Sequence, residues 1–227
     1  MKFFACLLPL LTCMGVLSQQ RDTLFIKREL ANSPYPFYHA IFIDSSDTYR
    51  KQLTDFSFTK DDSMNYRAQL TAIRPLKSFS PLLHKQQFPV TWVALYSYQE
   101  NYYLYSPSDF GNHYKFEIND STTIDFTMEG PEASRLDNMK FLSPTHLLIK
   151  RFNYWKGQTI DINLLDRTRG IAIFTFGPTR FNPKIRRLLM ADASKAYLYP
   201  VVVNYCATDK QEEFEFDKIN LSTSREY

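Results

Sequence analysis

Glycine and cysteine are both scarce in this chain of 227 residues, which contains 6 glycines and 3 cysteines. Few glycines, together with an aromatic content of 16%, favour strands over a flexible or repetitive chain, because aromatic side chains fit a pleated, half-buried surface. No repeat of fixed period and no low-complexity tract is visible. With 44% hydrophobic and 22% charged residues, the chain suits one globular domain with a substantial core.

Long apolar runs are missing after the first residues. Phe3–Leu11 is apolar but too short to span a bilayer, and Val16 and Ser18 are small enough to precede a cleavage site. We therefore expect a signal peptide at residues 1–18, and an exported domain at 19–227 with a frayed C-terminal tail. The export expected is to a periplasmic, secreted or cell-surface location.

Cys206 is the one cysteine left in the sequence once the expected signal peptide is removed. No internal disulfide is then possible, and the fold must depend on its core. The run Val201–Cys206 predicts a buried strand and a packed thiol. A lipid anchor on Cys13 is the alternative form of export, although the apolar Met14–Leu17 after it fits a lipidation signal poorly.

Motifs of catalysis and metal binding are also absent. The sequence has no Gly-x-Ser-x-Gly, no glycine-rich phosphate loop and no His-Glu-x-x-His. Acid pairs such as Asp125 with Glu129, or Asp161 with Asp166, lie where a wet strand face or a turn would leave them solvated. The isolated histidines are His39, His84, His113 and His146. We predict no catalytic residue, no metal and no cofactor, and keep an unannounced hydrolase as the third hypothesis.

Strand patterns are clearest between Pro144 and Gly177, where three strands are predicted at Thr145–Asn153, Gln158–Leu165 and Gly170–Phe176. In the middle strand apolar and polar residues alternate, which is typical of a strand with one buried face. The apolar set is Ile160, Ile162 and Leu164.

The flanking regions give weaker signals. Helices are predicted at Met64–Ile73 and Lys184–Ser194, where apolar residues recur at helical spacing. Short strands are predicted at Asp55–Phe58 and Phe214–Ile219, and a turn at 44–47.

About ten short strands joined by tight turns indicate a mainly β fold. The candidates are an antiparallel up-and-down barrel and a two-sheet sandwich, each with one or two short helices. Adjacent hairpins favour the barrel. Its architecture is like that of lipocalin-type barrels, although no motif residues carry a resemblance to a family.

An aromatic hairpin at Val90–Tyr105 is the first candidate site. Residues two apart share a strand face, so Trp92, Tyr96 and Tyr98 are expected to project inward together if the hairpin lines a barrel cavity. Such a cluster suits a polar-lined cavity, a recognition surface or an ordinary aromatic core. The candidate ligand-binding residues are Trp92, Tyr96, Tyr98, Tyr103 and Tyr105.

Charge is unevenly distributed, although the net charge is only +3. Residues 150–187 hold nine basic side chains and two acidic ones, whereas residues 209–227 hold six acidic and three basic ones. Either the two regions fold together, or the first forms a rim that attracts an anionic partner. The candidate rim residues are Arg151, Lys156, Arg167 and Arg169.

These observations support two main hypotheses. The first is an exported, non-enzymatic module that holds a small amphipathic or apolar ligand in a β-barrel cavity. The second is a cell-envelope or extracellular interaction protein that presents aromatic and basic side chains to a protein or an anionic glycan. Export and the modest net charge disfavour nucleic acid.

Overall fold

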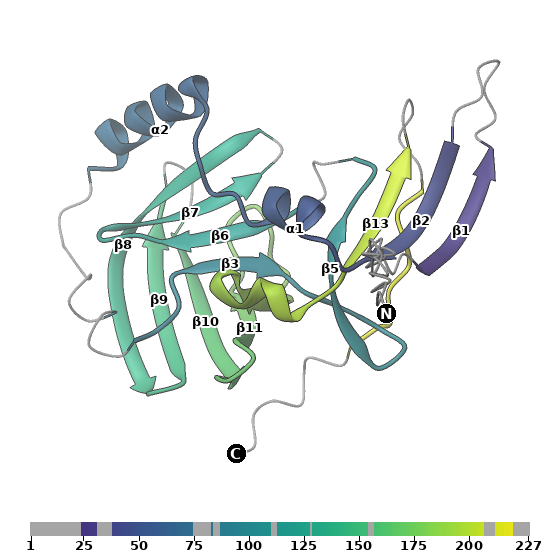
Figure 1. The fold of residues 1–227 in the computed structure, drawn as a ribbon. Helices are drawn as coiled ribbons and strands as arrows, with labels where there is room; N and C mark the ends of the chain where they lie inside the picture. Colours follow the sequence, from purple (N-terminus) through teal and green to yellow (C-terminus); the bar gives the residue numbers. More distant parts are fainter. Residues whose placement is uncertain are drawn as a thin grey trace, which may run out of the picture.

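The computed structural model of the chain describes residues 24–30, 38–74, 83, 87–109, 113–127, 129–153, 157–206 and 212–219. The fold is mainly β, as predicted, and combines a closed eight-stranded antiparallel barrel with a five-stranded sheet (Figure 1). The expected signal peptide with Cys13, the rim candidate Lys156 and the expected tail at 221–227 lie outside the described residues.

The barrel is an up-and-down meander, which confirms the predicted connectivity. Each strand pairs antiparallel with the next, and β12 closes the barrel onto β3 through the pairs Met190–Ala94 and Asp192–Trp92. The strands are β3 (Thr91–Ala94), β6 (Lys115–Ile118), β7 (Thr122–Thr127), β8 (Gly130–Ser143), β9 (His146–Phe152), β10 (Gly157–Asp166), β11 (Ile171–Phe176) and β12 (Arg186–Asp192).

The second sheet collects segments that precede, interrupt and follow the barrel. Its order is β1-β2-β13-β5-β4, and only the β13–β5 pair is parallel. The strands are β1 (Leu24–Leu30), β2 (Tyr38–Asp44), β4 (Tyr96–Tyr98), β5 (Asn101–Ser106) and β13 (Val201–Cys206). The sheet lies beside the barrel in Figure 1.

Three short helices complete the described part of the chain: α1 (Asp47–Leu53), α2 (Lys60–Ile73) and the 3₁₀ helix η2 (Ala193–Leu198). The predicted helix at 64–73 is confirmed as part of α2, which starts with a capping box between Thr59 and Asp62. This helix covers β8 (Figure 1). There the Gln69 side chain donates to the Pro131 carbonyl (3.0 Å) and accepts from the Ala133 amide (2.6 Å).

Three apolar clusters hold these elements together. The first fills the barrel with inward-facing residues such as Ile160, Ile162 and Leu164, all at most 4% exposed, as the alternation in β10 predicts. The second joins the outer face of β11, β12 and β3 to β13 and β5. The third lies on the opposite face of the second sheet, where residues 212–219 pack on it.

One predicted helix is wrong, because Lys184–Ser194 contains strand β12. Leu188 and Met190 pack in the barrel interior, while Leu189 and Ala191 pack in the cluster outside it. A strand buried on both faces has apolar residues at almost every position, so it also satisfies helical spacing. Pairing with β11 and β3 decides the outcome.

Smaller differences concern element boundaries. No strand forms at 55–58 or 214–219, and helix α1 starts in the predicted turn at 44–47. The expected single strand at 90–99 divides at Leu95 into β3 of the barrel and β4 of the second sheet.

Candidate ligand site at the barrel mouth

The inward-facing side chains change from apolar to polar at one end of the barrel. We call this end, where β7, β9 and β11 finish and β8, β10 and β12 begin, the barrel mouth. On β9 the face that buries Leu147 and Ile149 continues to Arg151, and on β10 the face of Ile160 begins with Gln158. The alternation of inward and outward side chains that builds the core therefore also places polar side chains at the mouth.

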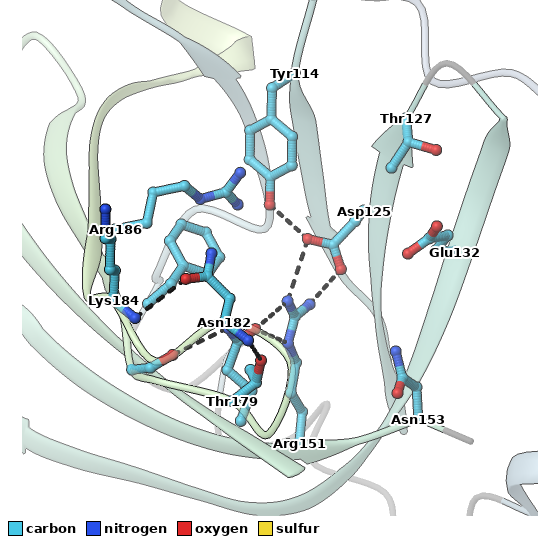
Figure 2. Close-up of a pocket in the computed structure, with 13 residues that line it drawn as sticks. Tyr114, Asp125, Thr127, Glu132, Arg151, Asn153, Thr179, Asn182, Lys184 and Arg186 are labelled. Atoms are coloured by element: carbon cyan, nitrogen blue, oxygen red, sulfur yellow. Dashed lines mark hydrogen bonds and ion pairs between the residues drawn. The ribbon is translucent and has the colours of Figure 1, made fainter. Parts of the chain in front are cut away.

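The floor of the mouth is an ion pair between Arg151 and Asp125, which are 6% and 8% exposed. Both terminal nitrogens of Arg151 donate to Asp125, with Nη2 3.2 Å from Oδ1. Further bonds run from Arg151 to Thr123 Oγ1 (3.1 Å) and to Gln158 Oε1 (2.7 and 3.3 Å). Tyr114 Oη donates to Asp125 at 2.5 Å (Figure 2).

These contacts use all five N–H groups of the Arg151 guanidinium. Burial lowers the pKa of Arg151, but the charge of Asp125 more than offsets this, and the pKa lies above its ordinary value. Burial also raises the pKa of Tyr114, and the neighbouring Asp125 charge raises it further, so the phenol remains a donor. The floor is therefore charge-balanced and hydrogen-bonded without a ligand.

Residues 177–186 line one side of the mouth above this floor. We call Lys184 and Arg186, the two basic residues of this segment that line the mouth, the cationic wall. Thr179 and Asn182 close a turn through bonds of 2.8 and 3.0 Å, and Asn182 Oδ1 accepts from the Lys184 amide at 3.1 Å. Arg186 lies on the inward register of Leu188 and Met190, with its guanidinium carbon 4.5 Å from the centre of the Phe176 ring. No carboxylate among the described residues forms an ion pair with Lys184 or Arg186.

The mouth encloses a cavity of about 240 Å³. Figure 2 shows Arg186 and Lys184 on one side of it and Glu132 on the other. The lining residues are Tyr114, Asp125, Thr127, Glu132, Arg151, Asn153, Gln158, Phe176, Gly177, Thr179, Asn182, Lys184 and Arg186. Apart from Phe176 and the tyrosine ring, these residues offer polar atoms, so the cavity suits a small charged solute better than an apolar one.

The five aromatic candidates do not share one cavity. Trp92 is 0% exposed inside the barrel, where its Nε1 donates to the Pro89 carbonyl at 3.1 Å. The other four lie in the second sheet: Tyr96, Tyr98, Tyr103 and Tyr105. The expectation that Trp92 and Tyr98 project inward together is wrong, because the strand leaves the barrel at Leu95.

The tyrosines of the second sheet are covered by the chain itself. The Phe216 ring stacks on Tyr96 at 4.5 Å, and the Phe214 ring lies 5.0 Å from Tyr98. Tyr105 Oη donates to Glu213 Oε2 at 2.5 Å and accepts from the Phe214 amide at 3.0 Å. The acidic C-terminal region thus folds onto the aromatic cluster and not, in its described part, onto the basic rim candidates.

The basic candidates do not form one rim either. Consecutive connections in an up-and-down barrel lie at opposite ends, so the β9–β10 connection is at the mouth and the β10–β11 turn at the far end. Arg167 and Arg169 belong to that distant turn, where Arg169 pairs with Asp166. Arg151 is near the mouth but buried and paired, which makes it part of the floor and not an exposed rim.

Asp125 is the main correction among the acids, because it was expected to be solvated. Thr123, Asp125 and Thr127 share one face of β7, and a wet face there implies that the apolar face with Ile124 and Phe126 is the buried one. In the fold Phe126 packs outside the barrel against Phe56 (5.2 Å between ring centres). The polar face of β7 therefore points inward.

The remaining polar candidates do not assemble a second site. His146 Nε2 lies 2.9 Å from Asp161 Oδ1 across neighbouring strands, at a partly exposed position. The described residues contain no group of three or more His, Cys, Asp or Glu side chains placed to hold a metal ion. Cys206 is partly buried at the end of β13.

Sequence reasoning missed Tyr114, Asp125, Gln158, Lys184 and Arg186 as site residues. A usable signal was present: on the inward face, a polar residue follows two buried aliphatic ones in β9 and precedes two in β10. For Arg186 the same pattern was not recognised, because residues 184–194 were predicted to form a helix and not a strand.

Comparisons with known proteins give no match: no protein-family model, no curated protein and no solved structure aligns with this chain. The site is therefore assigned from its geometry and chemistry. Among the described residues, no helix is both long and apolar enough to cross a membrane.

Proposed function

We propose that this chain is a non-enzymatic binding module that holds a small anionic solute at the barrel mouth. The observation that carries the proposal is the cavity of about 240 Å³, into which Lys184 and Arg186 bring positive charge above a floor that needs no ligand to balance it. A cavity of this size lies below the usual range for drug-sized ligands, so a solute of a few heavy atoms fits it.

The filled barrel interior changes the ligand expected from the sequence. Trp92, Phe116, Phe174 and Phe176 are each at most 1% exposed inside the barrel. An apolar ligand would have to displace these rings, whereas a polar ligand at the mouth displaces water. The proposal therefore keeps the binding role and replaces an apolar or amphipathic ligand by a small anion.

A binding role is favoured over catalysis by the state of the floor. Tyr114 and Asp125 are two titratable lining groups, but Tyr114 donates its hydrogen bond to Asp125, and Asp125 also accepts from Arg151. A general acid or base must exchange a proton with its substrate, and this network directs both groups away from that task.

Export is part of the proposal and depends on residues 1–18 of the sequence. We expect the mature protein to begin near Gln19 and to carry no acyl chain. The intact mass of protein from its native host decides this, and a diacylglycerol mass on Cys13 would contradict it.

Calorimetric titration tests the proposed site. The probes are acetate, pentanoate, phosphate and sulfate at low ionic strength, because salt screens partly exposed charges. We expect saturable binding of at least one anion, weakened about tenfold or more in Arg186→Ala, the loss of one charge-assisted contact.

Arg187→Ala is the matched control, because Arg187 is the next residue of β12 and is exposed outside the cavity. It should bind the same anion as the wild type does. Absence of saturable binding by every probe, or equal loss in the two arginine variants, would refute the proposed function.

A second candidate is an interaction surface for a glycan at a notch between the barrel and the second sheet. This hollow of about 330 Å³ is lined by Tyr102, Tyr103, Arg169 and Tyr199, among others. The Arg169 guanidinium carbon lies 5.4 Å from the centre of the Tyr102 ring, so aromatic and basic groups meet there. Glycan-array binding that is lost in Tyr102→Ala and kept in Arg186→Ala would favour this candidate.

A further inference from the structure

The charges around the mouth have opposite signs on opposite walls. In the closed order of eight strands, β8 and β12 are four strands apart in either direction, so they face each other across the barrel. Glu132 belongs to β8, and Arg186 begins β12. Figure 2 shows the two side chains on opposite sides of the cavity.

Both side chains point into the mouth by strand register. Glu132 shares the inward face of β8 with Leu136, which is buried in the barrel core, and the pairing of β8 with β7 is regular between residues 130 and 135. Arg186 shares the inward face of β12 with Leu188 and Met190. The two charges are therefore aimed at the same cavity by the same alternation.

Neither wall has an ion-pair partner within the described part of the chain, although Glu132 is the cross-strand neighbour of Asp125 and its charge helps to raise the pKa of Arg151. The floor residues Arg151 and Asp125 balance each other, and no described ion pair includes Glu132, Lys184 or Arg186. A simple anion would satisfy the cationic wall and leave the Glu132 carboxylate facing it. A solute with a positive group at its other end would satisfy both walls.

We propose that the ligand of the mouth is a small linear zwitterion, with a carboxylate or similar anion at one end and an ammonium group at the other. Its anion lies against Lys184 and Arg186, and its ammonium lies against Glu132. This inference depends on the proposed function, because it names the ligand class of the same site.

The geometry also predicts which zwitterions bind. Since the walls are on opposite sides of the mouth, the two charges of the ligand must be separated along its chain. In an ordinary α-amino acid the ammonium and carboxylate groups are attached to the same carbon. They are too close together for each to contact the wall of opposite charge. Two isomers, 5-aminopentanoate and 2-aminopentanoate, have the same composition and carbon chain and differ in the position of the ammonium group.

Calorimetric titration with these isomers, with pentanoate and with pentylamine tests the inference. We expect the wild type to bind 5-aminopentanoate about tenfold or more tightly than pentanoate or 2-aminopentanoate, the size of one added charge-assisted contact. Glu132→Gln should remove this preference and leave pentanoate binding within about twofold. Arg186→Ala should weaken both acids.

Glu129→Gln is the matched control, because Glu129 is an exposed acid in the turn before β8 and does not line the cavity. Melting temperatures of all variants confirm that they are folded. The inference is overturned if pentanoate binds as tightly as 5-aminopentanoate, or if Glu132→Gln keeps the preference. If no compound binds and Arg186→Ala changes nothing, the proposed function fails with it.

Discussion

The two ends of the barrel interior are built by the same strands and behave differently. At the far end the strands bury Leu164, Trp92 and Phe88, and the Phe88 ring lies 5.4 Å from that of Phe141. At the mouth they bury Arg151 and Asp125 instead. The far end is stabilised by excluding water, whereas the mouth is stabilised only while each buried charge keeps its partner.

The largest expected effect is at the apolar part of the interior. Ile162 is 0% exposed, and Ile162→Asp places an unpaired carboxylate in the core. The cost is several kcal/mol, comparable with the whole stability of a typical domain, so we expect loss of the native fold by circular dichroism. Asn163→Asp, on the outer face of the same strand, is the control and should melt close to the wild type. A folded Ile162→Asp protein would contradict this account of the core.

The next largest effect on stability is expected from substitutions in the floor of the mouth. Asp125→Ala leaves the Arg151 charge buried without its carboxylate, which should cost about 3–5 kcal/mol in urea unfolding. Replacing both partners, as in Asp125→Leu with Arg151→Met, should recover most of this loss. A single-variant loss below about 1 kcal/mol would mean that the pair is solvated and not buried.

A third prediction concerns the pH dependence of stability, which we expect to come from His113, just outside the barrel, and not from the buried pair Arg151 and Asp125. Burial lowers the pKa of His113 to about 4, and its Nε2 lies 2.9 Å from the Leu53 carbonyl oxygen. The unfolded chain binds this proton below about pH 6.5, so stability falls as pH drops from about 6.5 to about 4. The loss is about 3 kcal/mol.

Urea unfolding of the wild type and of His113→Gln at a series of pH values measures this effect. The variant should lack most of the decrease in that window. An equal decrease in both proteins would assign it to other groups.

The smallest expected effect on stability is at the cationic wall. Arg186 is exposed and its contacts with Phe176 and Tyr114 are cation–π contacts, so Arg186→Ala should change the free energy of unfolding by about 1 kcal/mol or less. A much larger loss would show that the wall supports the fold and would weaken its assignment to ligand binding.

The period-two pattern was enough to predict β9, β10 and β11 and their antiparallel connections, but not β12, which was predicted as a helix. In β10 it also predicted the buried side chains, because only one face of that strand is apolar. It did not show which face of β7 is inside, since residues 56 and 58 and helix α2 cover the apolar outer face and the polar one lines the mouth. The faces of a strand are local information, but what covers each face is not.

The site was harder to predict for a related reason. Arg151 and Asp125 are 26 positions apart, and nothing in either segment indicates that they meet. The split at Leu95 was hidden because apolar and aromatic residues continue from the barrel strand into the second sheet without a turn signal. Long-range pairing, and not local propensity, decides both features.

The order of the strands also has a consequence for the chain as it is synthesised. The barrel uses only residues 91–192, so its last strand follows soon after the others. The second sheet instead has β13 at its centre, between β2 and β5, and β13 is the last strand of the described chain. During synthesis β1 and β2 therefore emerge first and wait longest, as a hairpin too small to be stable alone. If synthesis stalls before Val201, the chain contains every barrel strand but lacks β13. The hairpin of β1 and β2 then has no strand through which to join the rest of the second sheet.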